Sequence, residues 1–143
     1  MSETEFAVPS GPGSEREVGE RVARVAVAAG ASPEVAAGLE LAVCEVARNA
    51  AEHGNRDLPD LPVAVTVRVG DGVLTVRITD QGAGGLPPGP RYGRPQALLA
   101  GAGEPRGLGL ELVHGLVDRF RAGSGPHGHT VELVANVGSG AGS

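Results

Sequence analysis

The sequence of 143 residues contains no lysine, and its aromatic residues amount to only 2%. With so few aromatic side chains, the 41% of hydrophobic residues must form an aliphatic core, mostly of valine, leucine and alanine. Every basic residue is an arginine, and the formal net charge is -5. This balance disfavours nonspecific binding of nucleic acid, which needs a basic face to neutralise phosphates.

Cysteine and long apolar runs are also scarce. The single Cys44 excludes an intramolecular disulfide and a cysteine-rich metal cluster. No apolar run approaches the roughly 20 residues of a membrane-spanning helix, and the acidic N-terminal residues lack a signal-peptide pattern. We therefore expect a cytoplasmic protein without membrane contact. Its length suits one domain over 1–143, with a core at 5–137 and a flexible C-terminal tail rich in glycine.

Two helices are predicted in the first part of the chain, after a short strand over 5–8. The first helix begins with a capping box, in which the Ser14 hydroxyl accepts from a free N–H and Glu17 reaches back. The second helix begins at 32–34 with a serine cap, a proline in the first turn and an acid near the positive end of the dipole. It carries an apolar stripe and ends at Gly54.

Alternating apolar and polar residues over 65–69 and 74–78 predict an antiparallel hairpin around a Gly-Asp-Gly turn. The other elements expected in chain order are a lid-like loop over 86–105, a helix opening at 106–110, a strand around 120, a loop over 123–128 and a strand over 130–135. Because few strands alternate singly with helices, this order favours an α+β fold with helices on one face of a mostly antiparallel sheet.

Glu45, Asn49 and His53 are spaced four residues apart, so on a helix they lie along one side. A carboxylate, an amide and an imidazole on one stripe suit the wall of a polar site. An amide oxygen can bind Mg²⁺, and a carboxylate one turn away can orient or deprotonate a nucleophile. A helix whose polar edge merely faces solvent gives the same pattern, so this stripe alone does not distinguish a polar site from an exposed helix edge.

Two glycine-containing motifs follow. Asp80 ends the second strand of the hairpin and precedes Gly82 and Gly84, so a flat ring can approach the backbone while the carboxylate accepts from an exocyclic amine. Gly107 and Gly109 precede the third predicted helix, whose free N–H groups favour phosphate. The first motif alone is also a common strand-to-loop turn, and the second alone is weak, since it is neither a P-loop nor a Rossmann fingerprint. Their significance comes from occurring in order with the helical stripe.

Together the three motifs resemble those of the GHKL superfamily of histidine kinase-like ATP-binding domains, which have the Bergerat fold. Residues 45–53 match the N box, 80–84 the G1 box and 106–110 the G2 box. The Asn-Ala-x-x-His-Gly end of the N box and the short lid are similar to those of bacterial anti-sigma-factor serine kinases. The resemblance implies a two-layer sandwich of a mixed, mostly antiparallel sheet with helices on one face.

The resemblance also implies roles for individual residues. Glu45 would be the general base that activates a serine hydroxyl or a water, and Asn49 would coordinate the Mg²⁺ that bridges the phosphates of ATP. Asp80 would bind the adenine amino group, with Gly84 near the ring and Thr130 lining the pocket. The other residues implied to contact the nucleotide are His53, Gly82, Gly107, Leu108, Gly109 and Leu110. Arg106 is added from its place at the end of the predicted lid, from which its side chain can reach the γ-phosphate.

The function implied by the resemblance is that of a protein-serine kinase. It would phosphorylate a STAS-type anti-sigma factor antagonist, sequester a sigma factor and form a homodimer, as family members commonly do. The alternative is a nucleotide-gated binding regulator without significant catalysis, because the predicted lid carries few charged side chains. A histidine-kinase catalytic domain is disfavoured, since few residues precede the first predicted helix. The remaining candidates, interpreted as helix or loop residues rather than ligands, are Cys44, His114, His127 and His129.

Overall fold

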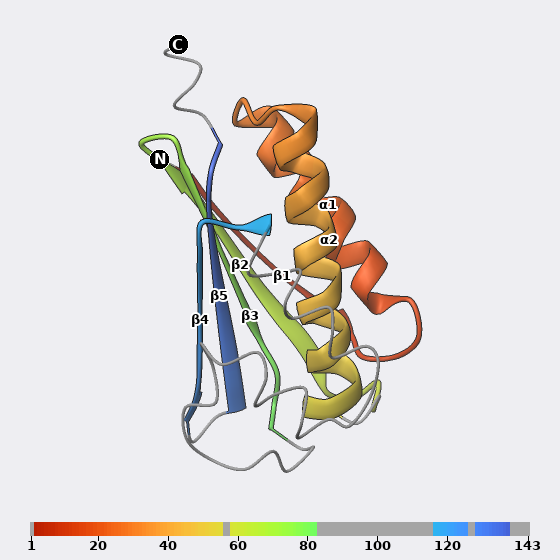
Figure 1. The fold of residues 1–143 in the computed structure, drawn as a ribbon. Coiled ribbons are helices and arrows are strands. Elements are labelled where there is room, and N and C mark those ends of the chain that lie inside the picture. The colour runs from red at the N-terminus through yellow and green to blue at the C-terminus, as the bar shows by residue number, and fades with distance from the viewer. Residues whose placement is uncertain (1, 56–57, 83–115, 126–127, 138–143) are drawn as a thin grey trace.

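The computed structural model describes residues 2–55, 58–82, 116–125 and 128–137. Within these residues, a five-stranded sheet carries two helices, α1 and α2, which pack together on one of its faces (Figure 1). This is the predicted two-layer α+β arrangement. In chain order the elements are β1 (Ser2–Pro9), α1 (Ser14–Ala28), α2 (Pro33–Asn49), η1 (Ala50–Gly54), β2 (Pro62–Gly70), β3 (Val73–Thr79), β4 (Arg119–Gly125) and β5 (Gly128–Asn136).

The strands lie in the order β1-β2-β3-β5-β4, and every described pair is antiparallel. The predicted hairpin is β2–β3, and its turn places Asp71 at φ 56 and Gly72 at φ 75. Both values belong to the primed turns that match the twist of paired strands. β5 pairs with β3 on the side opposite β2, so β3 is an interior strand. The residue that follows β3 therefore lies between neighbouring strands rather than at an edge of the sheet.

Two strands extend beyond their predicted limits. β1 begins at Ser2 because all of its residues pair with β2, as far as Pro9 opposite Pro62. The loop predicted over 123–128 is wrong in its extent, since Gly123 pairs with Thr130 inside the β4–β5 ladder. Glycine composition favours a loop there, but hydrogen bonding to the neighbouring strand keeps the backbone extended.

The capping box predicted for α1 is not formed. The N-cap is Gly13 at φ 90, and no side chain caps the helix. Ser14 is therefore already helical, its hydroxyl oxygen is buried without a hydrogen-bond partner, and Glu17 pairs with Arg21 at 3.1 Å instead. A cap must have non-helical backbone angles, so the one-residue shift removes Ser14 from that role.

The second helix begins as predicted but ends in a wider turn. The Ser32 hydroxyl accepts from the backbone N–H of Val35 at 3.1 Å, which confirms the cap. After Asn49 the helix continues as the π-helical turn η1, in which Asn55 N donates to Ala50 O at 2.8 Å. The helical region does end at Gly54, but its last turn spans one residue more than an α-turn.

The core between the helices and the sheet is aliphatic, as the composition predicts. Its largest fully buried side chains are Leu39, Leu74, Ile78, Leu133 and valines at 18, 22, 43, 63, 65, 67 and 76. The opposite face of the sheet is polar, and Glu132 there contacts Arg77 at 2.9 Å and Arg121 at 3.2 Å. Among the described residues, no helix is long and apolar enough to cross a membrane.

Candidate functional site

The π-turn at the end of α2 brings the N box and the G1 box into contact. A Cβ on Gly54 would lie 2.1 Å from Oδ2 of Asp80, which is closer than real Cβ atoms approach another atom. Only glycine therefore allows this backbone to lie against the carboxylate. The contact joins the end of η1 to the residue that follows β3, at one end of the two-layer sandwich (Figure 1).

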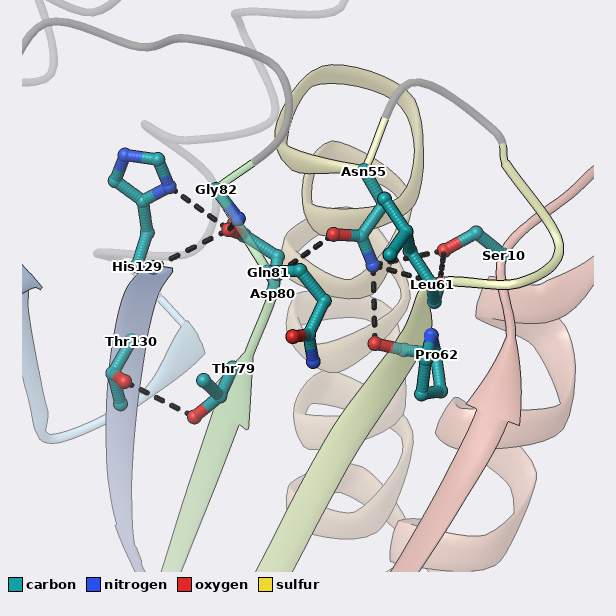
Figure 2. A network of polar contacts seen from close by, with 10 residues as sticks. All are labelled: Ser10, Asn55, Leu61, Pro62, Thr79, Asp80, Gln81, Gly82, His129 and Thr130. Atoms are coloured by element: carbon teal, nitrogen blue, oxygen red, sulfur yellow. Dashed lines mark hydrogen bonds and ion pairs between the residues drawn. The ribbon is translucent and has the colours of Figure 1, made fainter. Parts of the chain in front are cut away.

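The carboxylate of Asp80 is buried and held by its own chain. Only 5% of the residue is exposed. Its Oδ1 accepts from the Gly82 N–H at 2.7 Å, from the His129 backbone N–H at 3.3 Å and from Nδ1 of the His129 ring at 2.9 Å (Figure 2). The Asp80 N–H in turn donates to His129 O at 2.9 Å. The side chain is thus oriented without any ligand.

Glycine is required at two positions beside this carboxylate, one after β3 and one at the start of β5. Gly82 has φ 76 and Gly128 has φ 127, which are left-handed values that other residues adopt with strain. A Cβ on Gly128 would also lie 1.9 Å from the backbone oxygen of Asp80. Gly82 therefore has a structural role as well as the predicted one, because its conformation brings its N–H to Asp80.

Asn55 connects this region to three other segments, and sequence reasoning missed it. Its side chain is completely buried, and Oδ1 accepts from the backbone N–H of Gln81 at 2.7 Å. Its Nδ2 lies 3.0 Å from Ser10 Oγ, 3.0 Å from Leu61 O and 3.1 Å from Pro62 O (Figure 2). One amide therefore joins the end of β1, the start of β2 and the residue after Asp80.

The predicted catalytic pair lies on α2. Glu45 is 8% exposed, its Oε1 contacts the guanidinium of Arg48, and its Oε2 is buried without a hydrogen-bond partner. Asn49 is partly buried, and within the described part of the chain no hydrogen bond engages its side chain. A buried acceptor without a donor is costly, so Oε2 of Glu45 has an unmet capacity for a hydrogen bond.

Two further predicted residues lie differently from the expectation. His53 is on η1 rather than on α2, so the wider turn changes its angular relation to Glu45 and Asn49. Thr130 has its hydroxyl 3.0 Å from that of Thr79, and it alternates along β5 with His129, which faces Asp80 (Figure 2). The structure therefore brings the side chain of His129, and not that of Thr130, to Asp80.

The glycine-rich sequence around His129 predicts a loop residue, and this prediction is wrong. His129 is on β5 and only 7% exposed. Its sole signal in the sequence is its place between Gly128 and Thr130 at the start of a strand-like run. The predictions for Gly84 and for residues 106–110, together with the lid and most of the third helix, lie outside the described residues.

Comparison with known proteins agrees with this architecture. The family model of the histidine kinase-like ATPase domain matches residues 8–135. No curated protein matches the chain. The crystal structure of the RsbU and RsbW domains of Rv1364c from Mycobacterium tuberculosis is similar, with a TM-score of 0.68 and 19% sequence identity. At this identity the likeness concerns the fold alone, and the alignment covers 96% of this chain but only 33% of that one.

Proposed function

Because the chain belongs to the family of histidine kinase-like ATPase domains, we propose that it is an ATP-dependent protein-serine kinase and an anti-sigma factor. It phosphorylates a serine of a STAS-type antagonist and sequesters a sigma factor. The observation that carries the proposal is Glu45, a buried carboxylate with an unpartnered Oε2, one helical turn before Asn49. The resemblance of residues 45–53 to the N box of anti-sigma-factor kinases supports the choice of partners.

Asp80 binds the adenine end of the nucleotide in this proposal. An ionised carboxylate accepts hydrogen bonds, and the amino group of adenine donates them. The contacts of Oδ1 with Gly82 and His129 fix the orientation of the group. Because Gly54 has no side chain, only its backbone borders Oδ2 on that side.

The residues at the other end of the site fit a phosphate-bound Mg²⁺. This ion prefers oxygen ligands and usually keeps several waters beside substrate phosphates and one or two protein groups. The side-chain oxygen of Asn49 is such a group. In the part of the chain that the structure describes, no cluster of three or more His, Cys, Asp or Glu forms a cage for a metal. Residues 106–110 are proposed to bind the phosphates through backbone N–H groups, with His53 near the nucleotide.

Glu45 acts as the general base of phosphoryl transfer. Its Oε2 accepts the hydrogen of the serine hydroxyl, whose oxygen bonds to the γ-phosphorus as the bond to the β–γ bridging oxygen breaks and ADP leaves. Arg48 holds Oε1 and so orients the other oxygen. When bound, Mg²⁺ neutralises charge on the phosphates. If a water replaces serine, the same geometry leads to ATP hydrolysis.

A second candidate function is that of a nucleotide-gated protein-binding regulator without significant kinase activity. The contact between Arg48 and Glu45 favours it, because an ion pair that occupies one carboxylate oxygen opposes movement of the group. In that case Glu45 and Arg48 stabilise the helix and ATP controls only the affinity for partners. The two functions differ in whether removal of the Glu45 carboxylate abolishes phosphate transfer.

The first prediction decides between them through Glu45→Gln, which preserves the size of the side chain and removes the base. Under the kinase proposal, phosphate transfer from γ-labelled Mg-ATP to STAS-type proteins of the source organism falls by about 10²–10⁴-fold. ATP affinity stays within about twofold, since the change removes no nucleotide contact. Glu40→Gln on the same helix is the matched control and retains transfer.

Two results contradict the kinase proposal. The first is a Glu45→Gln protein that transfers phosphate at the wild-type rate. The second is a wild-type protein that binds ATP and a sigma factor but phosphorylates none of the STAS-type proteins, which is the result expected of the regulator.

A further inference from the structure

His129 reaches the carboxylate of Asp80 through the register of the sheet. Thr79 is paired with Thr130, and the next step of the ladder places Asp80 beside His129, where Asp80 N donates to His129 O at 2.9 Å. Nδ1 of the imidazole then lies 2.9 Å from Oδ1 in a pair whose members are 7% and 5% exposed. A buried contact between two polar side chains this close is a built feature of the site.

The direction of this hydrogen bond follows from the chemistry of the two groups. An ionised carboxylate can only accept, so the hydrogen between Nδ1 of His129 and Oδ1 of Asp80 belongs to the imidazole. The Nδ1–H tautomer is therefore the one that the site selects. The edge of the ring also lies beside Gly82, where a Cβ would be 3.8 Å from Cε1 of His129.

The two oxygens of Asp80 have unequal surroundings. Three N–H groups of the described residues converge on Oδ1, one from Gly82 and two from His129. Oδ2 instead faces the bare backbone of Gly54. A carboxylate oxygen has two lone pairs, so Oδ1 has no capacity for a further donor, and a ligand must use Oδ2.

We propose that His129 is a positioning residue for recognition of a purine amino group, because its imidazole holds Oδ1 of Asp80 and directs Oδ2 to the 6-amino group of adenine. This inference rests on the proposed function, in which Asp80 binds adenine. The terminal torsion of an aspartate is broad, so two backbone donors on Oδ1 fix the carboxylate less well than three donors do. His129 acts through Asp80 and makes no contact with the base in this role.

The test compares two nucleotides that differ only in the amino group. Purine riboside 5′-triphosphate lacks the 6-amino group and so forms no hydrogen bond with Asp80. We expect His129→Ala to weaken ATP binding by about tenfold and to change purine riboside triphosphate binding by less than about twofold, as measured by calorimetry at constant Mg²⁺. His129→Asn, whose amide N–H replaces the Nδ1–H donor, restores most of the ATP affinity.

The control is Glu132→Gln, which alters β5 on the face opposite His129 and leaves both affinities unchanged. An equal loss of both nucleotides in His129→Ala overturns the inference, because a general distortion of the pocket does not distinguish the amino group. Unchanged ATP binding in His129→Ala overturns it as well.

Asp80→Asn separates this inference from the proposed function. If Asp80→Asn leaves ATP affinity unchanged, adenine is not bound there and the proposed function fails. If Asp80→Asn weakens ATP but His129→Ala does not, the positioning role alone fails. A measurement without any variant completes the test: the ¹⁵N spectrum of the imidazole in the free protein should show the Nδ1–H tautomer, and an Nε2–H tautomer contradicts the proposal.

Discussion

Glu45 and Asp80, the two buried carboxylates of the site, share one arrangement at the scale of single residues. In each, a side chain of the protein engages one oxygen, Arg48 in the first case and His129 in the second. The other oxygen accepts no hydrogen bond from the described residues. Holding one oxygen orients the group, and under the proposed function the other oxygen is the acceptor for a ligand. The carboxylates were predictable from their motifs.

The residues that hold Asp80 were not predictable, for a physical reason. His129 is 49 positions from Asp80 along the chain, and Asn55 is 26 positions from its partner Gln81. Their hydrogen bonds depend on the sheet register and on the π-turn, neither of which a local pattern specifies. Arg48 contacts Glu45 within one turn, so helical spacing alone suffices to place that pair.

Cys44 provides a prediction at the same scale. Burial raises the pKa of its thiol, and the carboxylates of Glu40 and Glu15 raise it further. Sγ also lies 3.4 Å from Glu15 O, to which it donates. Because the thiolate is the reactive form, a raised pKa leaves less of it at pH 8. Iodoacetamide should therefore alkylate the native protein about tenfold more slowly than the urea-unfolded chain, as followed by mass spectrometry. Equal rates in both states contradict this expectation.

At the scale of elements, alternation and turn chemistry predicted the β2–β3 hairpin, whereas strand lengths depended on pairing. The glycine-rich end of β4 illustrates this, since its ladder with β5 overrides a composition typical of loops. The π-turn η1 also escaped prediction, because the residues in it suit an α-helix equally well. It nevertheless brings Gly54 against Asp80 and places Asn55 in the core.

Asn55→Ala tests how strongly the junction between the end of β1, the start of β2 and the residue after Asp80 depends on one amide. The change removes four contacts and leaves the N–H of Gln81 without its acceptor, so we expect a loss of about 3 kcal/mol in the free energy of unfolding. Ser10→Ala removes a single partner of Asn55 and should cost about 1 kcal/mol. Urea titration of both variants provides the comparison. A loss in Asn55→Ala no larger than that in Ser10→Ala shows that the junction does not rely on the amide.

At the scale of the whole molecule, the helices cover one face of the sheet, and the candidate site lies at one end of the sandwich (Figure 1). The site is assembled from α2 with η1, from the end of β3 and from the start of β5. These segments are also joined through the common core. A ligand that contacts several of them at once binds the folded state and not the unfolded chain, so its binding energy adds to global stability.

The last prediction follows from this linkage. At a concentration 100 times its dissociation constant, Mg-ATP should raise the free energy of unfolding by about 2.7 kcal/mol, which corresponds to a rise in Tm of about 8 °C for a domain of this size. Scanning calorimetry with and without Mg-ATP measures the shift. Asp80→Asn at the same Mg-ATP concentration should lose most of it, because the amide no longer offers an ionised acceptor to the adenine amino group. Glu132→Gln, on the opposite face of the sheet, should retain it. An equal shift in Asp80→Asn removes Asp80 from the nucleotide site, and no shift in the wild-type protein contradicts ATP binding itself.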